Sequence, residues 1–257
     1  MQRRAYRGHW GTFPVSPADA CERFAAVIGS GRGSFRVAID LEEAARVEDA
    51  RLAGDPARRL ALWRGLLTAG FEAFWNGLRD SDGAVATVLG DALDAYARLP
   101  WRETGIDPAG YWTDLCELCI WEDWGIRHRR ESAPFRHVPR THAPLIEELL
   151  RALEAEHRAA RLDYQADEAI QMVAWLAVAT HSYTRFVPVA ERLGADWWIP
   201  VVALAETAMK SGRTQLARDV FGAAIAPGGL HTEHLARRCR ELTGAEPPRR
   251  RRLRAVQ

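Results

Sequence analysis

Two cysteines three positions apart, Cys116 and Cys119, come closest to a pattern that does chemistry in this chain. Zinc in proteins is held by thiolates and imidazoles that converge as a tetrahedron. His128 and His137 follow closely enough to complete such a set, so a zinc-dependent enzyme is one interpretation. The cysteines lie inside an amphipathic helical pattern and not at a turn framed by glycine or proline, which favours thiols of the hydrophobic core. We favour the core and expect no metal, no cofactor and no catalytic residue.

The stretch from Arg127 to His142 carries the strongest local charge, with five arginines and three histidines against a single acid. Guanidinium groups bind phosphate and carboxylate in a bidentate manner, and the nearby Trp121 and Trp124 offer faces on which bases can stack. The stretch therefore indicates an anion or nucleic-acid contact. The alternative is a solvated loop that pairs with acidic residues between positions 42 and 49. The arginines concerned are Arg127, Arg129, Arg130, Arg136 and Arg140.

A second basic element follows Pro247 and Pro248. We expect residues 245–257 to be a disordered Arg-rich tail. Such a tail attracts phosphates in a salt-dependent, sequence-independent way. Together with the basic loop 126–142, it supports the alternative of a nucleic-acid-associated factor. Its candidate contacts are Arg249, Arg250, Arg251 and Arg252.

Tryptophan occurs ten times, more often than a domain of this size usually needs. Trp197 and Trp198 are consecutive, so on a helix their side chains diverge by about 100° and cannot both face one apolar stripe. One of them should be exposed or line an interface, where aromatic residues are favoured anchors. The predicted partner-binding residues are Trp197, Trp198, Trp121 and Trp124. Core positions are predicted for Trp63, Trp75, Trp112 and Trp175.

The elements that must position these residues are predicted to be almost entirely helical. Asp55 and Asp107, each followed by proline, read as helix N-caps. Residues 35–39 alternate weakly and suggest a short extended segment. The apolar spacing predicts helices over about 17–28, 40–52, 55–78, 84–99, 107–125, 143–161, 166–180, 184–193, 197–210, 214–225 and 232–242.

The connections between these helices are mostly short, which makes sequential helices antiparallel neighbours. The predicted fold class is therefore all-α, an irregular α-solenoid of stacked antiparallel helical hairpins. The expected organisation is an extended arm over 1–16, an N-terminal helical region over 17–142 with the basic loop 126–142, C-terminal helical hairpins over 143–244, and the tail 245–257.

Residues 196–227 resemble a tetratricopeptide hairpin, although Val201 stands where an aromatic residue is expected. A lone hairpin of this kind must stack on other helices to bury its apolar face. The segment from Leu60 to Leu99 resembles an uncharacterised family of bacterial helical-repeat proteins with an acidic-Ser-Asp-Gly turn, here at residues 80–83. Arg79 stands where that family usually has a further acid. Both resemblances imply an α-solenoid, and neither implies an activity.

The composition excludes several function classes. A net charge of +1 gives no global field toward nucleic acid or membrane. The N-terminal arginines are not followed by an apolar region of the signal-peptide type, so we expect a cytoplasmic protein with no membrane contact. Lys210 is the only lysine among 35 basic residues, as in proteins of GC-rich bacterial genomes. We therefore expect a non-catalytic adaptor or scaffold subunit of a larger bacterial complex, which binds protein partners.

Overall fold

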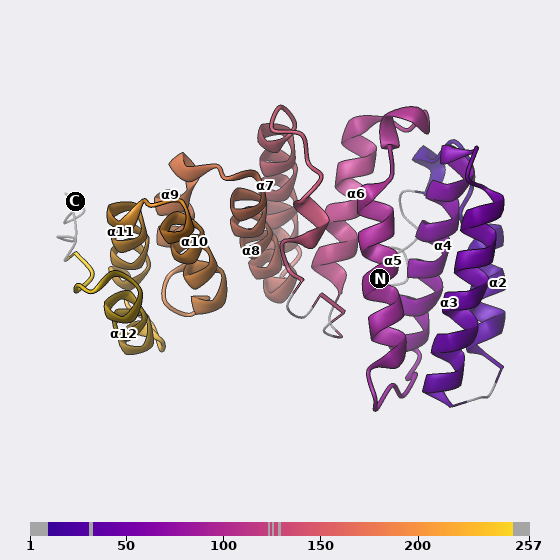
Figure 1. The fold of residues 1–257 in the computed structure, drawn as a ribbon, viewed down its shortest axis with the longest axis horizontal. Coiled ribbons are helices and arrows are strands. Elements are labelled where there is room, and N and C mark those ends of the chain that lie inside the picture. Colours follow the sequence, from indigo (N-terminus) through magenta and orange to yellow (C-terminus); the bar gives the residue numbers. More distant parts are fainter. Residues whose placement is uncertain (1–9, 31–32, 123, 125, 128–129, 249–257) are drawn as a thin grey trace. The chain divides into compact units, whose positions relative to one another are not determined.

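The computed structural model describes residues 10–30, 33–122, 124, 126–127 and 130–248. Over these residues the chain forms eleven α-helices, three short 3-10 helices and no strand, which confirms the predicted all-α class (Figure 1). The chain divides into two compact units, residues 1–137 (unit 1) and 138–257 (unit 2). None of the described helices combines the length and the apolarity that crossing a bilayer requires.

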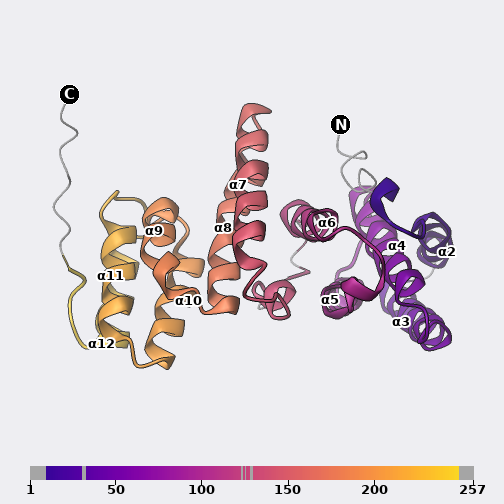
Figure 2. The same ribbon diagram turned by 90° about the horizontal axis from the view of Figure 1, so that it is seen from above.

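Unit 1 is organised around α4, which packs along α2 and against α5, while α3 also packs against α5 (Figure 2). Most of the predicted arm lies outside the described residues, and its last part contains the 3-10 helix η1. The elements of unit 1 are η1 (Trp10–Thr12), α2 (Ala18–Ile28), α3 (Ser34–Arg51), α4 (Pro56–Trp75), α5 (Ala84–Arg98), η2 (Trp101–Glu103), α6 (Pro108–Trp121) and η3 (Ala133–Phe135).

Helix α4 approaches its neighbours closely because it has glycine at the crossing points. A Cβ atom at Gly65 would lie 2.6 Å from Cβ of Ala20 and 2.7 Å from the backbone nitrogen of Cys21, both in α2. A Cβ atom at Gly70 would collide with the side chain of Leu89 in α5. These two positions set the distance of α4 from both neighbours.

The local helix signals are confirmed where a side chain caps the helix. The carboxylate of Asp55 accepts from the N–H of Arg58 at 3.0 Å, and that of Asp107 accepts from the N–H of Gly110 at 2.9 Å. The extended segment predicted over 35–39 is wrong, because α3 begins at Ser34 and runs without a break. Its buried residues Val37, Leu41 and Ala45 recur every four positions, so the first turn belongs to the same apolar face.

A buried ion pair ties α4, α5 and α6 together. The Arg64 Nε–H donates to the two carboxylate oxygens of Asp114 at 3.0 and 2.8 Å, and the two side chains are 2% and 1% exposed. The Tyr96 hydroxyl donates to the same carboxylate at 2.8 Å, and Arg64 also donates to the hydroxyl of Thr68. Burial and the adjacent carboxylate raise the pKa of Tyr96 well above its ordinary value.

In unit 2 the helices from α8 onward contact both the next helix and the next but one. Within residues 196–227 the chain forms the two helices α10 and α11, which contact one another. Gly212 lies in the turn between them with φ +71°, as expected for a helix C-cap glycine. The helices are α7 (Ala143–Ala159), α8 (Asp163–Thr180), α9 (Tyr183–Leu193), α10 (Trp198–Lys210), α11 (Thr214–Ile225) and α12 (Thr232–Thr243).

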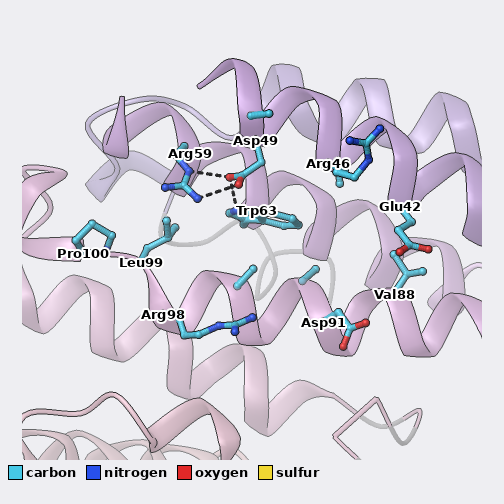
Figure 3. Close-up of a pocket in the computed structure, with 14 residues that line it drawn as sticks. Glu42, Arg46, Asp49, Arg59, Trp63, Val88, Asp91, Arg98, Leu99 and Pro100 are labelled. Carbon is cyan, nitrogen blue, oxygen red and sulfur yellow. Dashed lines mark hydrogen bonds and ion pairs between the residues drawn. The ribbon is translucent and has the colours of Figure 1, made fainter. Parts of the chain in front are cut away.

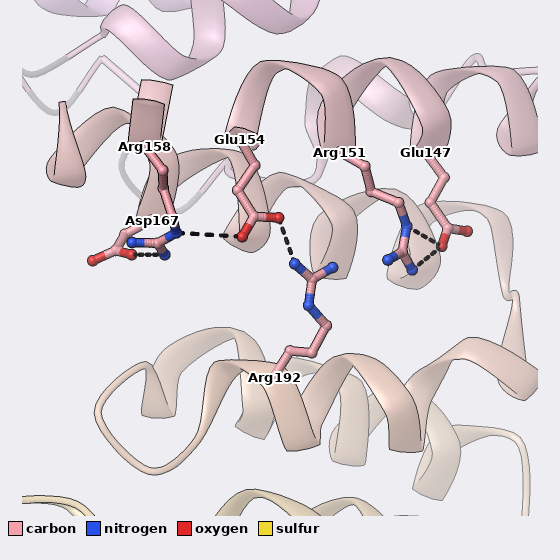
Figure 4. A network of polar contacts seen from close by, with 6 residues as sticks. All are labelled: Glu147, Arg151, Glu154, Arg158, Asp167 and Arg192. Atoms are coloured by element: carbon pink, nitrogen blue, oxygen red, sulfur yellow. Dashed lines mark hydrogen bonds and ion pairs between the residues drawn. The ribbon is translucent and has the colours of Figure 1, made fainter. Parts of the chain in front are cut away.

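Charged residues in unit 2 join helices at the periphery of the packing (Figure 4). Glu154 of α7 binds Arg192 of α9 and lies 3.6 Å from Arg158 of its own helix. Arg158 in turn donates to Asp167 of α8 at 2.7 Å. The arginines of this network are more than a third exposed, so water shares in solvating them.

The first residues of the predicted tail lie against α11 and α12. Glu246 accepts through its backbone carbonyl from Arg218 at 3.1 Å, and its carboxylate binds Arg240 at 2.9 Å. Pro248 covers Gly222, where an added Cβ atom would lie 2.8 Å from the proline carbonyl oxygen. The arginine run that begins at Arg249 lies outside the described residues.

Candidate functional site

A groove of about 600 Å³ lies between α3, α4 and α5 in unit 1, and we call it the α3–α5 groove (Figure 3). Four alanines of α3 and α5 line it beside six charged residues, and the short alanine side chains leave room between the helices. The indole of Trp63, from α4, is half-buried in this groove. This volume lies within the range of pockets that bind small molecules or the side chains of a partner.

The floor of the groove is held in place by hydrogen bonds between α3 and α4. The Asp49 carboxylate receives two hydrogen bonds from Arg59, both at 2.8 Å, and one from the Trp63 indole N–H at 2.9 Å. The bond to Asp49 also raises the pKa of Arg59. Because Arg59 and Trp63 are four positions apart on α4, one carboxylate fixes both side chains.

The two ends of the groove carry opposite charges. Arg98 lies toward the end formed by Pro100, and Glu42 lies at the opposite end with Asp91 (Figure 3). Arg98 Nε donates to the backbone carbonyl of Asp94 at 3.0 Å, and its terminal nitrogens have no partner among the described residues. Glu42 makes no hydrogen bond or ion pair within the described part of the chain, but Arg46, which also lines this end of the groove, interacts electrostatically with it. Arg98 therefore offers a positive charge to an incoming group, and Glu42 offers a carboxylate beside Arg46.

The described lining of the groove is charged and apolar. No histidine, cysteine, serine or lysine is among the residues that line it, as far as the lining is described. The half-buried carboxylate of Asp49 is held by Arg59 and Trp63. Such a lining can contact both charged and apolar parts of a ligand.

The predicted partner-binding tryptophans belong to two different units. Trp124 packs on the C-terminal end of α4, with ring centroids 5.5 Å from Phe74 and 5.8 Å from Phe71. Trp75 lies in the same aromatic cluster and is 45% exposed, so its predicted core position is wrong. Trp121 is half-buried at the end of α6.

Both members of the consecutive pair in unit 2 are half-buried. Trp197 is the N-cap residue of α10. Trp198 packs edge-on against His234 of α12, with ring centroids 4.6 Å apart. The two indole rings were expected to point in different directions, with one of them exposed or at an interface. Neither ring is fully exposed, because α12 covers part of Trp198.

Two arginines of the basic loop are engaged in structural ion pairs. Arg127 is 8% exposed and lies 3.4 Å from Glu122, whose carboxylate also caps the backbone N–H groups of the turn that follows α6. Arg130 binds Asp91 and lies 3.8 Å from Asp94, so its pKa is raised. These partners differ from the predicted acids between positions 42 and 49, of which Glu43, Glu48 and Asp49 pair with arginines of their own region.

The other arginines of the predicted anion-binding set have different placements. Arg136 and Arg140 are exposed and have no ion pair among the described residues. Arg129 lies outside the described residues, as do Arg249, Arg250, Arg251 and Arg252.

The zinc candidates are not brought together within the described part of the chain. Cys116 and Cys119 are fully buried in α6, and burial raises the pKa of the Cys116 thiol, with the neighbouring Cys119 adding to the effect. His137 is exposed, and His128 lies outside the described residues. No three His, Cys, Asp or Glu side chains of the described residues form a group that could hold a metal ion.

Sequence reasoning missed the residues that form the groove. Trp63 was predicted as a core residue, and neither Asp49 nor Arg98 stood out. The spacing of Arg59 and Trp63 after an acidic helix is the one local signal, since both side chains share a face of α4. No local sequence pattern predicts that α3 packs against α5.

No protein-family model matches this chain, and no curated protein or solved structure matches it either.

Proposed function

We propose that this protein is a non-catalytic interaction subunit that binds a protein partner in the α3–α5 groove. The observation that carries the proposal is a fixed, half-buried Trp63 in a groove with Arg98 toward one end and Glu42 at the other. Aromatic side chains held in place at the centre of a groove are the usual energetic anchors of protein interfaces. The rim charges add orientation, because each favours one sign of charge on the partner.

The chemistry of the groove defines the occupant. A bulky apolar side chain of the partner would cover Trp63 and the alanines of the groove. A carboxylate on one side of it would bind Arg98, and a lysine or arginine on the other side would bind Glu42. The proposed ligand is therefore a peptide segment with the order acidic, apolar, basic along the groove, or its reverse if the segment runs in the opposite direction.

We further infer that unit 2 is a short α-solenoid that serves as a scaffold. The support is the contact pattern of α8–α12, in which each helix packs on the next and the next but one. Small residues allow this packing, and the hairpin residues Leu204, Ala208, Ala217 and Phe221 are fully buried. Stacks of this kind present extended surfaces to protein partners.

A selection of displayed random peptides on the immobilised full-length protein tests the proposed function. We expect the enriched peptides to share a bulky apolar residue flanked by one acid and one base. Trp63→Ala should weaken binding of a selected peptide at least about tenfold, because it removes the central anchor. The double variant Arg98→Glu with Glu42→Arg should prefer peptides whose acidic and basic positions are exchanged.

Arg79→Glu is the matched control, since Arg79 is exposed, lies outside the groove and has no ion pair among the described residues. It should bind the selected peptides as the parent protein does. Peptides that bind the Trp63→Ala variant undiminished, or a double variant with unchanged charge preference, would contradict the proposal. Matching unfolding midpoints of the variants would show that they are folded.

A further inference from the structure

A second, much smaller pocket of unit 1 lies between α5 and η3. Its volume is about 60 Å³, and it is lined by Asp94, Arg98, Ala133, Arg136 and His137. The helix η3 contacts α5, and within η3 Phe135 is fully buried and Ala133 is 5% exposed. Arg136 is the residue that directly follows η3, so this contact brings it to the pocket.

Two guanidinium groups at this pocket have no acidic partner among the described residues. Arg98 uses Nε for the carbonyl of Asp94 and keeps its terminal nitrogens free. Arg136 makes no side-chain hydrogen bond or ion pair within the described part of the chain. His137 adds an imidazole, which has an N–H donor in either tautomer.

A third arginine, Arg130, offsets one of the two carboxylate charges nearby. Arg130 binds Asp91 and lies 3.8 Å from Asp94, the one acid that lines the pocket. Two carboxylates (Asp91 and Asp94) therefore face three guanidinium groups (Arg98, Arg130 and Arg136), which leaves one positive charge before His137 is counted. The excess lies on the two arginines that are free to bind.

We propose that this pocket binds one tetrahedral oxyanion of the phosphate monoester type. Guanidinium forks bind such anions in bidentate geometry, and a phosphate monoester carries more negative charge than a carboxylate. The pocket holds a single group, because its volume is about one-fifth of the ~300 Å³ at which sites for whole small molecules begin. Arg127 and Arg130 are not part of the site.

The oxyanion site is separable from the α3–α5 groove although Arg98 lines both. Arg136 and His137 line only the small pocket, whereas Glu42 and Trp63 line only the groove. Loss of phosphate binding in Arg136→Gln together with unchanged peptide binding therefore bears on the oxyanion site alone.

Calorimetric titration of the full-length protein with inorganic phosphate at low ionic strength tests the proposal, with phosphoserine and acetate in parallel. We expect saturable binding of one phosphate, weaker binding of acetate, and a loss of about tenfold or more in Arg136→Gln and in Arg98→Gln. Arg136→Lys keeps the charge but not the fork, so its affinity should lie between those of the parent and Arg136→Gln.

Arg140→Gln and Arg79→Gln are the matched controls, because both arginines are exposed, unpaired among the described residues and outside this pocket. Phosphate binding that these controls weaken as much as Arg136→Gln would overturn the proposal, as would the absence of saturable binding. Comparable affinity for phosphoserine would identify a modified side chain as a source of the anion. If a single-stranded oligonucleotide binds more tightly than phosphate, and if Arg140→Gln weakens that binding as much as Arg136→Gln does, the protein has a diffuse basic surface and the single-site proposal is overturned.

Discussion

The two units use the same chemical pair, arginine with a carboxylate, in opposite environments. In unit 1 the pair of Arg64 and Asp114 lies in the core, and both side chains are at most 2% exposed. In unit 2 the glutamates Glu147 and Glu154, whose side chains are 10% and 13% exposed, each bind an arginine of α9, and those arginines are 52% and 36% exposed. The two environments therefore differ in how well water can solvate the arginine when its ion pair with the carboxylate is broken.

A buried charge restricts the structure far more than a peripheral one. An isolated charge in the core costs several kcal/mol, so α4, α5 and α6 must keep the register in which Asp114 meets both Arg64 and Tyr96. The same α4 and α5 form the floor and one wall of the groove. Unit 1 thus holds its candidate site on helices of fixed register, whereas the peripheral pairs of unit 2 tolerate small shifts of α7 against α9.

The largest expected effect comes from removing one member of the buried pair. Asp114→Asn should lower the free energy of unfolding of unit 1 by about 3–5 kcal/mol, because it removes the buried carboxylate charge that Arg64 binds. Chemical denaturation followed by circular dichroism measures it. The triple variant Arg64→Met, Tyr96→Phe and Asp114→Leu removes every charge and should recover most of that loss. A triple variant as unstable as Asp114→Asn would show that the charges themselves stabilise the fold.

Replacing glycine by alanine should also destabilise unit 1 more than unit 2. Gly65→Ala places a Cβ atom against the backbone of α2 and should cost about 1–3 kcal/mol through overpacking. Gly222→Ala in unit 2 places a Cβ atom 2.8 Å from the backbone oxygen of Pro248, so residues 245–248 must shift; because these residues are held by exposed contacts, the cost should be smaller than that of Gly65→Ala. Thermal unfolding of both variants tests this order, and equal losses would mean that residues 245–248 are as rigid as the core of unit 1.

A peripheral pair should contribute little. Glu154→Gln should lower the free energy of unfolding by about 1 kcal/mol or less, because Arg158 and Arg192 remain solvated. The loss should shrink further in 1 M salt, which screens exposed charges. Denaturation of parent and variant at low and high salt measures both numbers. A loss near that of Asp114→Asn would remove the contrast between the units.

The smallest effect concerns His234 beside Trp198. Partial burial, and then Arg237 and Arg238, hold the pKa of His234 below its ordinary value. The folded state thus favours the neutral imidazole, so its contribution to stability is present above the unfolded pKa of about 6.5 and is lost as the pH falls through the folded pKa. Titration by NMR should give a midpoint below 6.5, and a midpoint above that value would contradict this environment.

Local features of this fold were predictable from the sequence, and contacts between distant residues were not. Asp55 and Asp107 cap helices within three residues of themselves, and both helix starts were predicted. Arg64 and Asp114 are 50 positions apart, so no spacing pattern announces their pair. The short segment 35–39 was mistaken for extended chain because its apolar face is complete only when the rest of α3 is included.

The candidate site likewise combines local features, which were predictable from the sequence, with contacts between distant residues, which were not. The charge of the basic loop was visible in the sequence, but which arginines remain free depends on Glu122, Asp91 and Asp94, and the last two belong to α5. Trp63 was recognised as helical and apolar-facing. Its exposure to a groove follows from the alanines that α3 and α5 contribute beside it.

Hydrogen–deuterium exchange of the full-length protein with a selected peptide tests the central claim most directly, namely that unit 1 binds a partner in the α3–α5 groove. Slower exchange on peptide binding is expected in residues 42–50, 59–63 and 88–100, which line the groove. The Trp63→Ala variant should show no such change at the same peptide concentration. Protection confined to α10–α12, or unchanged exchange along the groove at saturating peptide, would contradict the account.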